Sequence, residues 1–223
     1  MNDNKRTKLI NILVICLYFI WPYFLSAITN FLNLSKTVNL YLSFSVNFIF
    51  LFIVIYIYRN ILNKYYIEFT KKYKKNFLNC LKIFFIGLVL YVFSNTILNI
   101  VNIPVFNNQS SMIEMFKKVP ILFILNTLFY YPIIEELVFK MSLKNIIKNK
   151  WLFIITTGLL NAFFQIVFSI TNVTDLLYLL PLTFLISSFS YIYYKTDNIV
   201  YPILIRMSYN LIPCVIYLID LFV

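Results

Sequence analysis

The chain has 223 residues, of which 61% are hydrophobic and 12% are charged, and its mean hydropathy is +0.84. Soluble domains carry about 25% charged residues, so this composition excludes an ordinary soluble domain and predicts an all-α polytopic transmembrane helix bundle. No polar block is long enough for a second domain, and we expect residues 1–223 to form a single membrane domain. The net charge is +11. Because the basic residues lie between apolar runs, they indicate contact with the lipid bilayer and not with nucleic acid.

Histidine is absent from the chain, which removes the commonest metal ligand and the commonest general base. Cys16, Cys80 and Cys214 lie in or beside apolar runs without short spacings, so we expect packing residues and neither a disulfide framework nor a zinc site. The chain has only two glycines. We therefore expect little Gly-based close helix packing and no Gly-rich phosphate loop.

Seven apolar runs are long enough to cross a membrane. In chain order, the predicted spans are residues 9–29, 38–58, 83–103, 119–139, 151–170, 176–194 and 199–222. The first run is too long for a signal peptide and lacks a small-residue cleavage site, which favours a retained helix. The segment 59–75 contains six basic residues and a single acid, which predicts a short amphipathic helix on the membrane surface.

Basic residues alternate between the two sides of these spans. Most lie at the N-terminus and in segments 59–75, 140–150 and 195–198, whereas the intervening loops contain few. The positive-inside rule then predicts a multi-pass protein of the cell membrane, with its N-terminus in the cytoplasm and its C-terminus outside. The pair Lys117–Lys118 is the exception to this pattern.

Two adjacent acids, Glu135 and Glu136, lie near one end of the fourth apolar run. Ionisable groups within a span cost about 2.5–3.5 kcal/mol each on insertion scales and mark a functional site by default. Arg206, within the last run, needs an acid partner, and either glutamate can supply it. Lys140 lies four residues after Glu136 and is a second partner on the same helix face.

Two further polar pairs lie at i, i+4 spacing, each on one helix face. Asn161 and Gln165 lie in the fifth run, and Arg206 and Asn210 lie in the seventh. With the predicted topology these residues share the depth of the glutamates, which predicts a polar cavity open toward the cytoplasm. The alternative for Asn161 and Gln165 is simple hydrogen bonding between helices.

The order and spacing of these motifs resemble the CPBP family, the CAAX-protease and bacteriocin-processing membrane proteins, also called Abi. That family shows Glu-Glu-x-x-x-Arg, then Phe-x-x-x-His, then His-x-x-x-Asn or His-x-x-x-Asp. Here the first motif reads Glu135 to Lys140, and the third matches through the stretch from Tyr191 to Asn210. The resemblance covers about residues 120–215, a CPBP-like core.

The resemblance implies a role for each matching residue. Glu135 matches the glutamate that activates the attacking water in active members, and Glu136 with Lys140 matches a supporting acid–base pair. Gln165 and Arg206 stand where the family has histidines, and Asn161 stands where it has Phe. Active members would use zinc, but Arg206 has no lone pair for a metal, so we expect no metal site and no cofactor.

Three functions remain open. The first is a catalytically impaired member that binds a membrane peptide or another membrane protein, and the resemblance suggests bacteriocin immunity, peptide export or envelope regulation as its setting. The second is an active intramembrane endopeptidase with Glu135 as base, oriented by Glu136 and Lys140, and with Arg206 and Asn210 as oxyanion donors. The third is a small transporter or channel component with an intramembrane acid–arginine relay. We favour the first.

Overall fold

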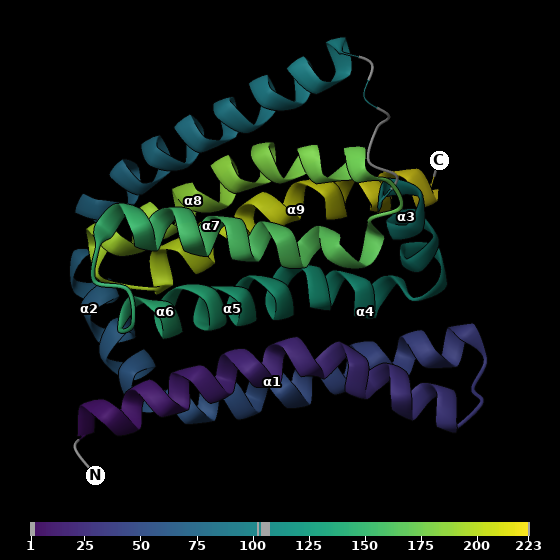
Figure 1. Cartoon of the computed structure of the whole chain (residues 1–223), viewed down its shortest axis with the longest axis horizontal. Helices are drawn as coiled ribbons and strands as arrows, with labels where there is room; N and C mark the ends of the chain where they lie inside the picture. Colours follow the sequence, from purple (N-terminus) through teal and green to yellow (C-terminus); the bar gives the residue numbers. More distant parts are fainter. Residues whose placement is uncertain (1–2, 102, 104–107, 223) are drawn as a thin grey trace.

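The computed structural model describes residues 3–101, 103 and 108–222, and in this part of the chain the secondary structure is entirely helical (Figure 1). The long helices are α1 (Asp3–Phe31), α2 (Lys36–Ile100), α7 (Lys150–Ile166), α8 (Leu179–Thr196) and α9 (Val200–Phe222). A further continuous run joins α4 (Pro120–Leu125), η1 (Asn126–Tyr130), α5 (Tyr131–Glu135), η2 (Glu136–Met141) and α6 (Ser142–Lys144), in which η1 and η2 are π-helical. Between these elements lie α3 (Asn108–Lys118), η3 (Val167–Ser169) and η4 (Val173–Tyr178). The predicted all-α bundle is confirmed.

Six helical segments of the described chain are long and apolar enough to cross a membrane. They are Thr7–Phe31, Lys36–Tyr73, Asn76–Ile100, Pro120–Lys144, Val173–Thr196 and Val200–Ile219. The fifth predicted span corresponds to α7, whose 17 residues rise about 26 Å, just below the usual hydrocarbon thickness. Helix α1 starts at one end of the bundle and α9 finishes at the other (Figure 1). Which end faces the cytoplasm stays a prediction.

Helix α2 differs from the prediction of two spans and a separate surface helix. It is one helix of 65 residues that contains the second predicted span, the third up to Ile100 and the whole of segment 59–75. Before Gly87 this stretch contains neither glycine nor proline, so nothing in its sequence interrupts the backbone hydrogen bonds. Figure 1 shows that α2 follows α1, runs across the left end of the bundle and returns along α8.

Both glycines lie at close helix contacts, so the expectation of little Gly-based packing was wrong. A Cβ added at Gly87 of α2 would lie 2.5 Å from the Cβ of Ser188, and one added at Gly158 of α7 would lie 2.1 Å from the Oγ of Ser187. Ser187 and Ser188 are neighbours in α8. The two glycines therefore allow α2 and α7 to approach adjacent positions of α8, as small residues do between membrane helices.

Buried amides connect the first half of the chain to the fourth span. Trp21 Nε1 donates to Asn47 Oδ1 at 3.2 Å, and Asn47 Nδ2 donates to Asn126 Oδ1 at 3.1 Å. Asn126 in turn donates to the carbonyls of Leu122 and Phe44. Sequence reasoning missed this chain of contacts, although a lone Asn inside an apolar run was a usable signal. It joins α1, α2 and η1 where the bilayer offers no water to polar groups.

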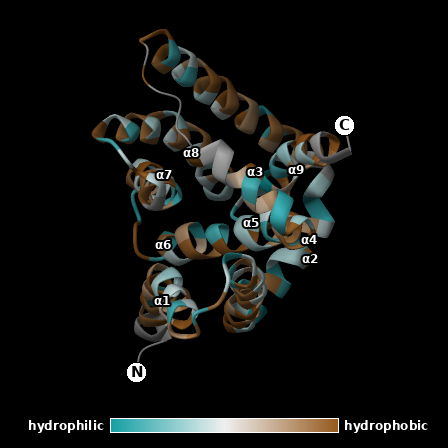
Figure 2. Cartoon of the chain, turned by 90° about the vertical axis from the view of Figure 1, so that its right-hand side faces the viewer, coloured by the Kyte–Doolittle hydropathy of each residue, from teal (hydrophilic) through white to brown (hydrophobic). Residues whose placement is uncertain are grey.

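Many large apolar side chains lie on the outward faces of the helices. Figure 2 shows hydrophobic residues on both sides of α1 and α7. The exposed fractions of Ile20, Ile86 and Trp151 are 59%, 63% and 63%. Such exposure suits lipid contact and identifies a multi-pass membrane fold.

Candidate functional site

The two glutamates lie where the fourth span changes from α-helix to π-helix. Glu135 is the last residue of α5 and Glu136 the first of η2. Single-turn π-helical insertions occur frequently at functional sites. Glu135 is 4% exposed and Glu136 is fully buried, so both carboxylates need partners inside the protein.

Arg206 of α9 bridges the two glutamates. Its Nη2 donates to Glu135 Oε2, and its Nη1 donates to Glu136 Oε1 at 3.1 Å. The side chain of Arg206 is 7% exposed. The planar guanidinium thus binds two carboxylates from successive residues of another helix, a geometry that the fork of arginine favours.

Lys140 completes the charge balance. Its Nζ donates to Glu136 Oε1, and the side chain is fully buried. Segment 140–150 was expected to begin a basic loop, but the helix continues through η2 and α6, which places Lys140 inside the bundle. Two acids and two bases therefore form a buried cluster without net charge, hereafter the ion-pair cluster (Glu135, Glu136, Lys140 and Arg206).

Phe189 of α8 lies against both cations. Its ring centroid is 5.7 Å from Lys140 Nζ and 5.8 Å from Arg206 Cζ, and the residue is 2% exposed. These distances suit cation–π attraction, which is stronger in a desolvated setting. The aromatic ring was not identified from the sequence, because nothing in the pattern of α8 separates Phe189 from the other phenylalanines of the chain.

Replacing Lys140 with methionine will lower the free energy of unfolding by about 2 kcal/mol, because Glu136 loses one cation but keeps Arg206. Detergent-solubilised protein followed by circular dichroism during denaturation measures this change. Lys64→Met is the matched control, since Lys64 and Glu68 form an exposed i, i+4 pair at 4.0 Å. That control should shift stability by less than about 0.5 kcal/mol, and equal effects of the two substitutions would contradict the importance of burial.

The two polar i, i+4 pairs predicted from the sequence have different contacts in the structure. Gln165 Nε2 donates to Glu135 Oε2 at 3.0 Å and to Asn161 Oδ1 at 3.2 Å, so α7 contributes both predicted amides to the glutamate site. Asn210 instead donates to the backbone carbonyl of Thr127 in η1 at 2.8 Å. The pairing of Arg206 with the glutamates and of Lys140 with Glu136 agrees with the sequence reasoning, whereas no such contact joins Asn210 to the glutamates.

Two buried polar atoms of this site have no hydrogen-bond partner within the described part of the chain. They are Glu136 Oε2 and Asn161 Nδ2. Gln165 and Asn210 are partly exposed, while Asn161 is fully buried. The polar cavity stays a prediction. In the structure the charged groups of the site contact one another.

The donor set does not fit a zinc ion. Among the described residues no group of three or more Cys, Asp or Glu side chains comes together. The space between the two carboxylates is reached by the Arg206 guanidinium, a permanent cation without a lone pair. A metal ion there would face a positive charge in place of a third ligand.

Fold and site together define a multi-pass helical membrane protein with a buried ion-pair cluster shared by its fourth and last spans. Residues 117–212 match the family model described as Rce1-like, type II CAAX prenyl endopeptidase Rce1-like. This match confirms the CPBP resemblance, and the matched residues include the whole ion-pair cluster. No curated protein and no solved structure matches the chain significantly.

Proposed function

We propose that this protein is a catalytically impaired member of the Rce1-like family, which binds a membrane peptide or a partner membrane protein without cleaving it. The observation that carries the proposal is the contact of Arg206 with both Glu135 and Glu136. Bacteriocin immunity, peptide export or envelope regulation is the setting that the family resemblance suggests.

The ion-pair cluster opposes water activation by Glu135. A general base needs an acceptor site directed at the attacking water. Here Glu135 Oε2 accepts from both Arg206 and Gln165, so these donors compete with water for that oxygen. The residues that match the family histidines thus supply donors to the glutamate and no lone-pair nitrogen.

An active endopeptidase would need Arg206 and Asn210 as oxyanion donors. Arg206 directs Nη1 and Nη2 to carboxylates, and Asn210 directs Nδ2 to the Thr127 carbonyl. Such donors should instead point to the position of a developing oxyanion. These contacts support the impaired form over the active one.

Zinc content of the purified protein tests the proposal. We expect the natural chain to hold no stoichiometric zinc, and the double variant Gln165→His with Arg206→His to bind about one zinc per chain, because two imidazoles then join Glu135. Elemental analysis after gel filtration measures both. The same double variant with Glu135→Gln is the control and should lose the metal.

Incubation with a farnesylated CAAX-type peptide completes the test. Mass spectrometry should find the peptide intact, and a photo-crosslinkable version should label the protein. Cleavage that disappears in Glu135→Gln, or stoichiometric zinc in the natural chain that this substitution removes, would establish an active endopeptidase and overturn the proposal.

A further inference from the structure

The middle of α2, residues 59–75, forms a distinct surface at one end of the bundle, hereafter the basic segment. It connects two membrane spans within a single uninterrupted helix. Figure 1 shows this part of α2 running across the ends of the other helices. Since each end of the segment continues directly into a span, no linker separates it from the membrane surface.

One face of the basic segment is fixed to the bundle. The ring of Phe69 lies 4.9 Å from that of Tyr201, and the hydroxyls of Tyr65 and Tyr193 are 3.2 Å apart. Asn198, in the turn between α8 and α9, donates to the Tyr65 carbonyl at 2.7 Å. These contacts determine which face of the segment points away from the protein.

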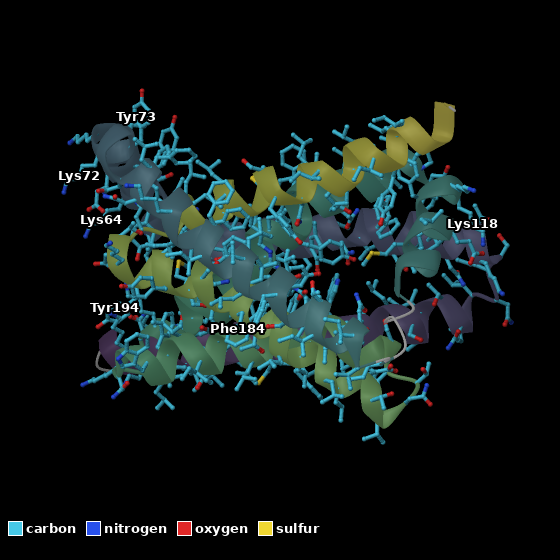
Figure 3. The ribbon with its side chains drawn as sticks, turned by 90° about the horizontal axis from the view of Figure 1, so that it is seen from above. Lys64, Lys72, Tyr73, Lys118, Phe184 and Tyr194 are labelled. Carbon is cyan, nitrogen blue, oxygen red and sulfur yellow. The ribbon has the colours of Figure 1, made fainter. Side chains whose placement is uncertain are left out.

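The rest of the segment's surface is exposed, and it carries basic and aromatic side chains beside Ile61 and Ile67. The structure describes the side chains of four of its six basic residues, Arg59, Lys64, Lys71 and Lys72, and all four are exposed. The single acid of the segment, Glu68, lies 4.0 Å from Lys64 and leaves a positive surplus. Tyr66 and Tyr73 are 64% and 45% exposed. Figure 3 shows Lys64, Lys72 and Tyr73 projecting at one end of the molecule and Lys118 at the other.

We propose that the basic segment is a binding surface for anionic phospholipid headgroups. Lysines beside a membrane attract anionic lipids, about fivefold in affinity for each residue, and exposed tyrosines are typical of the headgroup level. The fixed inward face and the two attached spans hold the lysines at this level. A nucleic acid or an acidic protein would have to compete with headgroups for the same cations.

Lipid binding by the full chain in detergent tests the proposal, with fluorescent phosphatidylglycerol as the probe and fluorescent phosphatidylcholine as the neutral reference. The natural chain should prefer phosphatidylglycerol. In the triple variant Lys64→Gln, Lys71→Gln and Lys72→Gln, the ratio of the affinities for phosphatidylglycerol and phosphatidylcholine should fall at least about tenfold. The matched control Lys36→Gln, Lys117→Gln and Lys118→Gln removes the same charge from the other end and should keep it.

Glu68→Gln provides a gain that misfolding cannot imitate. Removal of the only acid of the basic segment should raise the affinity for phosphatidylglycerol about twofold to fivefold. The proposal would be overturned if the triple variant kept its preference, or if both triple variants lost it equally. It would also be overturned if duplex DNA bound as tightly as phosphatidylglycerol and depended on the same lysines.

Discussion

Replacing Arg206 with methionine will lower the free energy of unfolding by about 3–5 kcal/mol, the usual cost of removing one partner from a buried ion pair. The expected loss is large because Arg206 is the only cation within hydrogen-bond distance of Glu135 and one of two at Glu136 among the described residues. After the substitution, the buried cluster holds two acids and one base. Detergent denaturation followed by circular dichroism measures the change.

A second substitution separates charge balance from packing. Arg206→Met combined with Glu135→Gln leaves the Glu136–Lys140 pair neutral, so at least half of the lost stability should return. Arg59→Met, at an exposed position, is the control and should stay within about 0.5 kcal/mol of the natural chain. If the double variant is no more stable than Arg206→Met alone, the destabilisation comes from the lost volume and contacts of the arginine.

Alanine at Gly87 will destabilise the protein more than alanine at Gly158. At Gly87 the new methyl group would meet the Cβ of Ser188 at 2.5 Å and the carbonyl oxygen of Phe184 at 3.3 Å, and neither atom moves by side-chain rotation. At Gly158 the closest neighbour is the Ser187 hydroxyl at 2.1 Å, which can rotate away, while the Ser187 Cβ and the Thr183 carbonyl oxygen lie at 3.3 Å and need to shift only slightly. We expect costs of about 2–3 kcal/mol at Gly87 and about 1 kcal/mol at Gly158, measured by the same denaturation.

The two sites require different rescues. Ser187→Ala removes the hydroxyl that meets the new methyl group at Gly158, so it should relieve most of the smaller cost. Ser188→Ala keeps the clashing Cβ and should not relieve Gly87→Ala, whereas Ser188→Gly should. Equal costs at both glycines, or rescue of Gly87→Ala by Ser188→Ala, would show that α2 and α8 are packed less closely than the structure indicates.

Much of the ion-pair cluster was predictable from residue type alone. A charged side chain within an apolar run is costly unless it has a partner of opposite charge, which predicted a contact of Arg206 with Glu135 or Glu136. The i, i+4 spacing predicted that Lys140 lies beside Glu136. The family match to residues 117–212 agrees with the motifs read from the chain. The partner of Asn210 was not predictable, because an amide can bond to any carbonyl that a π-helical turn leaves accessible, here that of Thr127.

Composition and run length determined the membrane fold, because a stretch of about 20 apolar residues has no comparable alternative to a bilayer-spanning helix. Tertiary structure decided which face of each helix meets another. In a membrane both the lipid face and the packed face are apolar, so hydrophobic periodicity does not reveal the rotation of a helix about its axis. For that reason the contacts of Gly87 and Gly158 with α8, the burial of Lys140 and the position of Phe189 near two cations come only from the packing of the helices.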